Sequence, residues 1–205
     1  MVITYYGLSC FKLQSGDMVL VTDPFSKDSG LTPPRFQANI VLTTSDNPNH
    51  SNTESLTGDP FIVTSPGEYE IKGIAIEGIH VGSSIYTFEW DGIRFCHLGA
   101  LSKKAFTEEV KEAIETPDVL FVPVGGGEGL EAEDAVDVIN QIEPHIIIPM
   151  HYDIKGLKSP KIAGPEAFLK EFGSDAKPQD KFTFKLKDVP QEETQLVYLE
   201  AFAKQ

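Results

Sequence analysis

The sequence predicts a mixed α/β protein, and three observations support this fold class. In residues 2–97, short apolar runs are separated by turn signals such as Asp91-Gly92, which is the pattern of β-hairpins. Beyond residue 100, apolar residues recur at helical spacing between further apolar runs. Three of the five histidines lie just past apolar runs, where α/β sheets carry their chemistry. We therefore expect a layered α/β fold with its site at one sheet edge.

The first half of the chain is expected to form strands. Ser15-Gly16-Asp17 joins two apolar runs as a hairpin turn, and residues 26–38, which include two prolines, are expected to form a surface loop. Short strands joined by turns in this way indicate an antiparallel sheet. The expected strands are residues 2–6, 10–14, 18–22, 40–43, 61–64, 69–71, 74–76, 79–81, 84–90 and 93–97.

The second half changes to a helical period. Phe106, Val110, Ala113 and Ile114 fall on one helix face, which predicts an amphipathic helix over residues 104–115. Later elements are expected at strand 118–124, helix 131–143, strand 145–150, helix 164–172 and strands 181–186 and 194–199. The first three of these later elements form a βαβ unit, which implies two parallel strands.

The composition limits the size of the fold and its partners. With 205 residues, 40% of them hydrophobic, the chain can bury a full core, so residues 1–205 are expected to form a single domain. The net charge of −14, from 31 acidic and 17 basic residues, repels phosphate backbones, so no nucleic-acid partner is expected. The expected partner is an unknown small molecule, and the protein is expected to be a monomer or a homo-oligomer.

Cysteine usage and apolar run lengths indicate a cytoplasmic protein. Cys10 and Cys96 are the only cysteines, which is too few for a disulfide framework. The first residues lack the basic and long apolar regions of a signal peptide. No apolar run approaches about 18 residues, so no membrane-spanning segment is expected.

Three histidines occupy equivalent places in this pattern. His50 follows the apolar run at 40–43, His97 ends the strand at 93–97, and His151 follows the strand at 145–150. Imidazoles at the carboxyl ends of several strands can converge on a metal ion or act as acid and base. The alternative is that each histidine is a satisfied polar residue in its own loop. His80 and His145 lie within or at the start of strands and are expected to be structural.

Six segments, taken in order, resemble the metallo-β-lactamase superfamily, in particular its small Zn-dependent hydrolases related to the ascorbate-phosphate lactonase branch. They are Tyr6-Gly7-Leu8-Ser9-Cys10-Phe11, Val21-Thr22-Asp23-Pro24-Phe25, Val41-Leu42-Thr43-Thr44, Pro66-Gly67-Glu68-Tyr69-Glu70, His97-Leu98-Gly99 and Pro149-Met150-His151-Tyr152. The resemblance covers nearly the whole chain. It implies an αββα sandwich with a two-metal site at one edge, between the two halves.

The metal-binding motifs of that superfamily are degenerate in this sequence. Where the family has H-x-H-x-D-H, this chain has Ser45, Asn47, Asn49 and His50. Where the family has His-x-Gly-Asp, it has His97-Leu98-Gly99-Ala100, so Ala100 replaces the bridging aspartate. The resemblance then leaves His97 from the first metal site, and His50 and His151 from the second.

These replacements favour a metal-depleted, non-catalytic member of the superfamily. Zinc prefers four ligands, and serine and asparagine are poor zinc ligands. The alternative is a mononuclear metal-dependent hydrolase of an ester, lactone or phosphodiester, with His50, His97 and His151 holding one divalent ion. That ion would be zinc, or else manganese or iron. Whether the protein is an enzyme is left open, and no catalytic residue is assigned.

Further residues are candidates for supporting the histidines. Asp23 matches a family aspartate that holds the metal loop through hydrogen bonds, although an aspartate before Pro24 can equally form a turn. Asp46 lies four residues before His50, at a spacer position of the motif. Tyr152 and Asp153 directly follow His151, and either of them can line the pocket.

Overall fold

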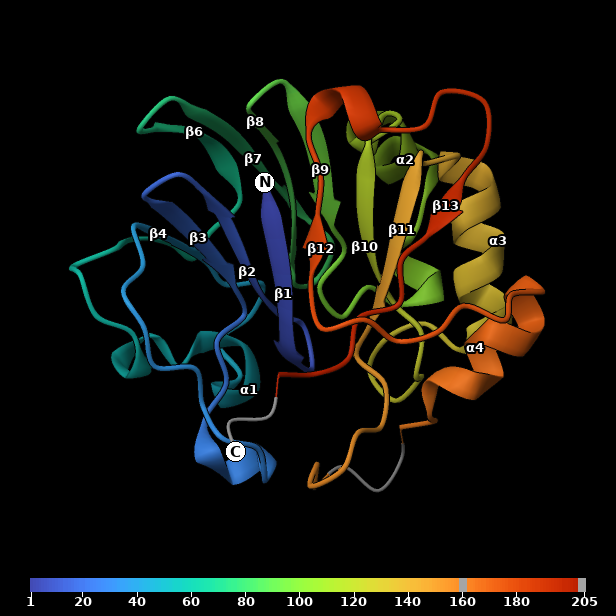
Figure 1. Ribbon diagram of the computed structural model, residues 1–205, viewed down its shortest axis with the longest axis horizontal. Coiled ribbons are helices and arrows are strands. Elements are labelled where there is room, and N and C mark those ends of the chain that lie inside the picture. Colours follow the sequence, from blue (N-terminus) through green and yellow to red (C-terminus); the bar gives the residue numbers. More distant parts are fainter. Residues whose placement is uncertain (159–161, 203–205) are drawn as a thin grey trace.

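The protein is built from two β-sheets packed face to face. The computed structural model describes residues 1–158 and 162–202. The six-stranded sheet has the order β12-β1-β2-β3-β4-β5, and the seven-stranded sheet has the order β13-β11-β10-β9-β8-β7-β6 (Figure 1). The first comprises β1 (Val2–Gly7), β2 (Cys10–Ser15), β3 (Met18–Thr22), β4 (Ile40–Leu42), β5 (Phe61–Val63) and β12 (Phe182–Thr183). The second comprises β6 (Gly67–Ile71), β7 (Ile74–His80), β8 (Ser84–Trp90), β9 (Ile93–His97), β10 (Val119–Pro123), β11 (Ile146–Met150) and β13 (Gln195–Leu196).

The main core lies between the sheets. Buried and partly buried residues alternate along β1, because successive side chains of a strand point to opposite faces. Phe11 stacks on Tyr5 from the neighbouring strand and contacts Phe121 of the other sheet, with ring centroids 4.9 and 4.5 Å apart respectively. Every residue of β10 and β11 is buried, as expected for parallel strands covered on both faces.

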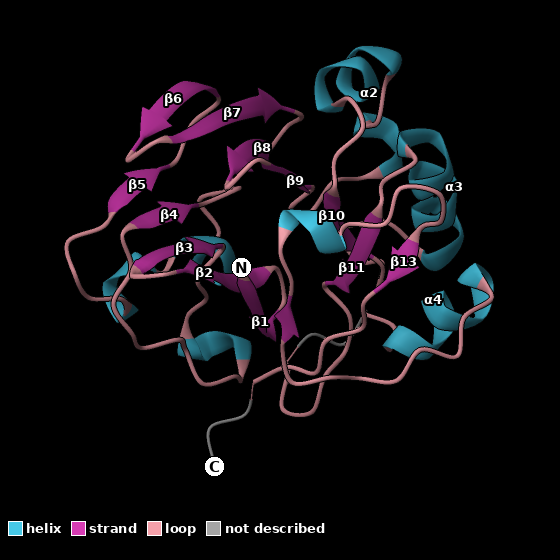
Figure 2. Cartoon of the chain, turned by 45° about the horizontal axis from the view of Figure 1, so that its top comes forward, coloured by secondary structure: helices cyan, strands magenta, loops and turns pink. Residues whose placement is uncertain are grey.

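Helices cover the outer face of the seven-stranded sheet at one end. These are α2 (Glu108–Ile114), α3 (Ala132–Ile142) and α4 (Pro165–Phe172), which lie beside β10, β11 and β13 (Figure 2). On the six-stranded side the outer layer is formed mainly by loops and the single turn of α1 (Pro48–Ser51), over a small second core that includes Val21, Phe25 and Val41. The predicted layered α/β fold class is confirmed. None of the described helices is both long and apolar enough to cross a membrane.

Two expectations from the first half of the chain are wrong. The six-stranded sheet is not purely antiparallel, because β4 pairs in parallel with both β3 and β5. The connections before and after β4 are long enough for such crossovers, which short hairpin turns are not. Residues 74–76 and 79–81 belong largely to one strand, β7, which runs through Gly78. At Gly78 an added Cβ would lie 2.9 Å from Pro66 Cα, so glycine marks a close chain approach rather than a break.

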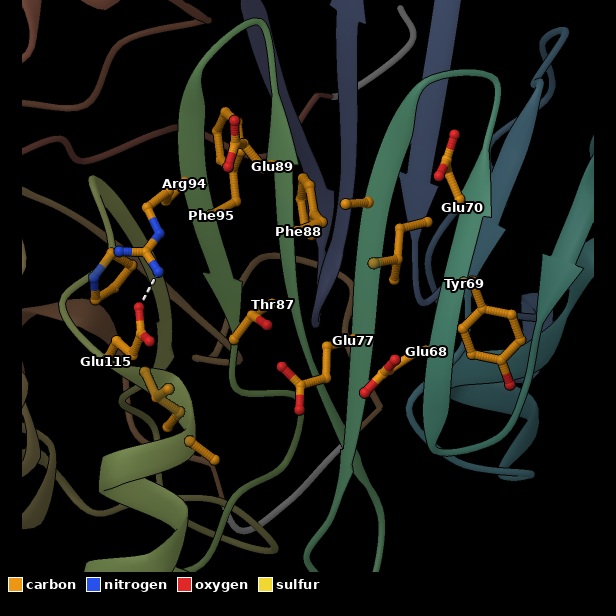
Figure 3. Close-up of a pocket in the computed structure, with 15 residues that line it drawn as sticks. Glu68, Tyr69, Glu70, Glu77, Thr87, Phe88, Glu89, Arg94, Phe95 and Glu115 are labelled. Carbon is orange, nitrogen blue, oxygen red and sulfur yellow. Dashed lines mark hydrogen bonds and ion pairs between the residues drawn. The ribbon is translucent and has the colours of Figure 1, made fainter.

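None of the helices in the described part of the chain covers the outer face of the seven-stranded sheet over β6, β7 and β8, and this face carries many carboxylates (Figure 3). Glu68 and Glu77 are directly opposite each other on β6 and β7. Glu89 of β8 is instead opposite Arg94 of β9, and Arg94 also pairs with Glu115 after α2. Like charges at directly opposite positions destabilise a sheet, whereas opposite charges stabilise it.

Glu77→Gln is therefore expected to raise the free energy of unfolding by about 0.5 kcal/mol, because it removes the repulsion with Glu68. Urea denaturation at low ionic strength would measure the change. Glu89→Gln is the matched control, since it makes the same change of charge but removes an attraction to Arg94. An equal gain in both variants would assign the effect to net charge and contradict the cross-strand repulsion.

Candidate functional site

The sequence-predicted residues meet where several strands end. Asp23 follows β3, His50 lies in α1 after β4, His97 is the last residue of β9, and His151 follows β11. The His151 N–H donates to the Leu8 carbonyl in the β1–β2 turn, at 2.7 Å, which ties the two sheets together at this edge. The pocket there has a volume of about 410 Å³ and is lined by Leu8, Asp28, Ser29, Asn47, Asn49, His50, Gly127, Glu128, His151, Leu157, Lys158 and Ile162.

A buried ion pair joins Asp23 and His50. Asp23 Oδ2 lies 2.9 Å from His50 Nδ1, and both side chains are almost completely buried. The carboxylate also accepts two hydrogen bonds of 2.7 Å from Thr44, one from its N–H and one from its hydroxyl. Burial opposes ionisation of both groups. Their mutual attraction outweighs it, so the pKa of His50 is raised and the pKa of Asp23 is lowered.

His151 lies beside this pair as a neutral base. Its ring centroid is 5.9 Å from that of His50, with the ring planes 17° apart. Burial, followed by the positive charge of His50, lowers the pKa of His151 to about 4. Its Nδ1 is buried and has no hydrogen-bond partner among the described residues, which leaves Nε2 as the ring nitrogen open to the pocket.

His97 is fully buried beneath the site, and its ring is held at both nitrogens. Nε2 lies 3.0 Å from the Ser9 carbonyl oxygen, and Nδ1 accepts from the Gly99 N–H at 3.2 Å. A carbonyl can only accept, so Nε2 carries the proton and the imidazole is neutral. Burial also lowers the pKa of His97, which favours the same neutral form of the ring. The structure therefore gives His97 the role of a satisfied core histidine.

The replaced motif positions have taken on local structural roles. The side chain of Asn47 accepts from the Asn49 N–H at 2.9 Å and caps α1, and Pro48 occupies the first turn, where proline is favoured. Residues 48–51 therefore form a helical turn. Ser45 accepts a 3.4 Å hydrogen bond from the Asn47 N–H, and Ala100 is partly buried in the turn after β9.

The other two candidate supporting residues lie elsewhere. Asp46 is exposed and is not among the residues that line the pocket. The Tyr152 hydroxyl donates to the Leu199 carbonyl at 2.8 Å, and Tyr152 lines a different hollow, together with Tyr198 and Glu200. Sequence reasoning missed Thr44, the hydrogen-bond donor to Asp23, and Glu128, whose charge also raises the pKa of His50. The position of Thr44 shortly after a buried strand was the feature of the sequence that could have identified it as a site residue.

Three residues at this sheet edge have a backbone conformation in the left-handed region, as do five other non-glycine residues elsewhere in the described part of the chain. Leu8, Asp23 and His151 have φ angles of 54°, 41° and 54°, in the left-handed region that side chains other than glycine, asparagine and aspartate rarely adopt. Such conformations persist only where the surroundings enforce them, and they cluster at functional sites. At Leu8 and His151, which line the pocket, the surrounding structure holds this conformation.

The donor set does not fit the metal centre that the motif resemblance implies. His50 has the arrangement of a metal ligand, with Nδ1 held by a carboxylate. His97 has no free nitrogen, and a metal on His151 Nε2 would leave Nδ1–H as a buried, unpaired donor. Within residues 1–158 and 162–202, no three His, Cys, Asp or Glu side chains are grouped so as to hold a metal ion.

Comparisons with known proteins decide the family. Residues 2–151, which include Asp23 and all three histidines of the site, match the family model described as the beta-lactamase superfamily domain. The chain belongs to the β-lactamase superfamily. The predicted resemblance and the metallo-β-lactamase type of fold are thereby confirmed.

Individual relatives match this superfamily member over most of its length. A crystal structure from Thermotoga maritima, named as a candidate Zn-dependent hydrolase of the metallo-β-lactamase superfamily, is 31% identical, covers 97% of this chain and 98% of its own, and has a TM-score of 0.82. A "UPF0173 metal-dependent hydrolase" of Thermoplasma acidophilum is 25% identical over 81% of this chain and 88% of its own. A protein of the same name from Alkaliphilus metalliredigens is 26% identical over 83% and 92%.

Proposed function

We propose that this superfamily member binds a small polar molecule in the histidine pocket and does not hydrolyse it by metal catalysis. The observation that carries the proposal is the state of the three histidines. His97 is hydrogen-bonded at both nitrogens, and His151 has no partner among the described residues that would orient it as a ligand. Of the three, His50 has the arrangement of a ligand. A catalytic zinc ion in a protein usually has three protein ligands, and this set provides one.

The pocket remains suited to a ligand. Its volume of about 410 Å³ lies within the usual range for small-molecule sites. Because the ion pair with Asp23 raises the pKa of His50, its ring favours the protonated form, which offers a hydrogen-bond donor at the base of the pocket, and the side chains of Asn47 and Asn49 offer amides beside it. Asp28 and Glu128 add carboxylates to the lining. These groups favour a small molecule with an acceptor group directed at His50 and with polar or cationic groups near the two carboxylates.

A second candidate is a hydrolase with one divalent metal ion. It is favoured by the carboxylate-held ring of His50 and by the relatives that are named metal-dependent hydrolases. In this alternative His50 and His151 bind zinc, manganese or iron, and an ester, lactone or phosphodiester is the substrate. Metal content separates the two candidates.

The deciding experiment is elemental analysis of protein purified without an affinity tag, together with His50→Ala and His151→Ala. His145→Ala is the matched control, because His145 pairs with Asp118 outside the pocket. We expect a metal content far below one ion per chain in all four proteins, and no thermal shift on adding zinc. About one ion per chain in the wild type and the control, lost from both pocket variants, would overturn the proposal and support the mononuclear hydrolase.

The remaining expectations from composition stay predictions. They are a cytoplasmic location, the absence of a nucleic-acid partner, and a monomeric or homo-oligomeric state. Cys10 and Cys96 are both free and buried, which is compatible with a reducing compartment.

A further inference from the structure

A second hollow lies on the outer side of the six-stranded sheet. It has a volume of about 210 Å³ and shares no lining residue with the histidine pocket. Its walls come from β1 and β2, from the loop segment 32–36, and from the C-terminal segment that runs back along β1, where the Phe202 N–H donates to the Tyr5 carbonyl at 2.8 Å. The β1 and β2 strands that carry it are seen in the interior of their sheet in Figure 1.

Three aromatic rings form the apolar part of this hollow. The Tyr6 ring lies between the other two, with its centroid 5.2 Å from that of Phe36 and 5.3 Å from that of Phe202, each at 45°. Phe202 is 49% exposed, so much of its side chain is accessible to a ligand. Pro33 and Pro34 complete the lining on the loop side. Rings in this arrangement present apolar faces and edges to a further ring.

The polar part of the hollow consists of two cations. The Lys12 ammonium lies 5.0 Å from the Phe36 ring centroid, and Arg35 follows from the adjacent loop. Neither forms an ion pair with a carboxylate in the described part of the chain. Partial burial lowers the pKa of Lys12, so its ammonium is held with part of its hydration removed. Two cations that line one small hollow without a carboxylate partner among the described residues stand out in a protein with 31 acidic and 17 basic residues.

The charged residues of an adjacent hollow indicate where an anion would bind. This adjacent hollow shares Tyr6, Thr32 and Phe202 with the hollow of about 210 Å³, and its other charged lining residues are three carboxylates, Asp153, Glu166 and Glu200, and one cation, Lys155. Carboxylates outnumber the cation in that lining, so an anion would be attracted instead to Lys12 and Arg35, which line the smaller hollow. Size adds a further limit, because about 210 Å³ is below the range of sites for drug-sized ligands.

We propose that this hollow binds a small carboxylate that carries one aromatic ring. The ring packs among Tyr6, Phe36 and Phe202, and the carboxylate accepts charge-assisted hydrogen bonds from Lys12 and Arg35. Arginine supplies a planar fork that matches a carboxylate, and lysine supplies a point charge. This site is separate from the histidine pocket, so it stands independently of the function proposed there.

The test is a titration of ¹⁵N-labelled full-length protein with phenylacetate, followed by amide chemical shifts. We expect saturable shifts confined to residues 5–12, 32–36 and 199–202, with a dissociation constant on the order of 1 mM, as the small ligand size allows. Phenylacetamide, which keeps the ring but is neutral, and cyclohexylacetate, which keeps the charge but not the aromatic ring, should each bind at least about fivefold more weakly.

Two variants and a matched control complete the design. Lys12→Gln/Arg35→Gln and, separately, Phe202→Ala should weaken phenylacetate binding at least about tenfold, while the distant and exposed pair Lys104→Gln/Lys187→Gln makes the same change of charge without effect. All are surface or partly buried changes, and the spectrum of each variant reports its fold. Absence of saturable shifts at the hollow would overturn the proposal, as would equal binding of phenylacetamide or equal loss in the control pair.

Discussion

Asp23→Ala is expected to lower the free energy of unfolding by about 3–5 kcal/mol, the usual cost of removing one partner from a buried ion pair. The carboxylate is fully buried and accepts three hydrogen bonds, one from His50 and two from Thr44. Without it, His50 must lose its proton and the buried donors of Thr44 lose their acceptor. Chemical denaturation at pH 7, followed by circular dichroism, would measure the difference.

Two variants show whether the effect arises from this pair. Asp46→Ala removes an exposed carboxylate from the neighbouring loop and should change stability by less than about 0.5 kcal/mol. Asp23→Asn keeps an acceptor for the Thr44 N–H but has no charge, so its cost should fall between the two. If Asp23→Ala were as mild as Asp46→Ala, the ion pair would not be holding α1 against the end of β3.

Asp23 also shows what sequence could and could not predict. Buried strands were predictable because Val21, Ile40 and Ile146 belong to apolar runs bounded by turn residues. A histidine at the end of such a run therefore had a predictable place at the sheet edge. The choice between a hydrogen-bonding Asp23 and a simple turn before Pro24 depended on His50, 27 residues away. Local sequence does not contain that contact.

His97 was less predictable for the same physical reason. Its position at the end of β9 was expected, but its role depends on the Ser9 carbonyl, 88 residues away, which reaches it only when the two sheets pack. The parallel pairing of β4 was missed because the apolar pattern of a buried strand does not encode the direction of its neighbours. Asn47 was identified only as a position where a metal ligand is lost. Its role as the cap of α1 was also predictable from sequence, because asparagine is a favoured residue at the start of a helix.

The stability of the protein is expected to fall as pH decreases from 7 towards 4, with His151 contributing about 3 kcal/mol to the loss. The pKa of His151 is about 4 in the folded protein, well below the ordinary histidine value of 6.5. Between these values the unfolded chain binds a proton that folded His151 does not, so acid favours unfolding. His50 acts in the opposite sense. Its raised pKa stabilises the fold below about pH 6.5, and this contribution is lost as pH rises through its folded value.

The experiment compares wild type with His151→Ala by urea denaturation from pH 7 to about 5.5, which stays above the calculated isoelectric point of 4.7. Over this range the wild type should lose about 1 kcal/mol more than the variant, the part of the His151 effect that falls there. His80→Ala, which removes an exposed histidine at the end of β7, should follow the wild type. Parallel curves for wild type and His151→Ala would mean that His151 accepts a proton in the folded state, and a neutral base beside the Asp23–His50 pair would then be excluded.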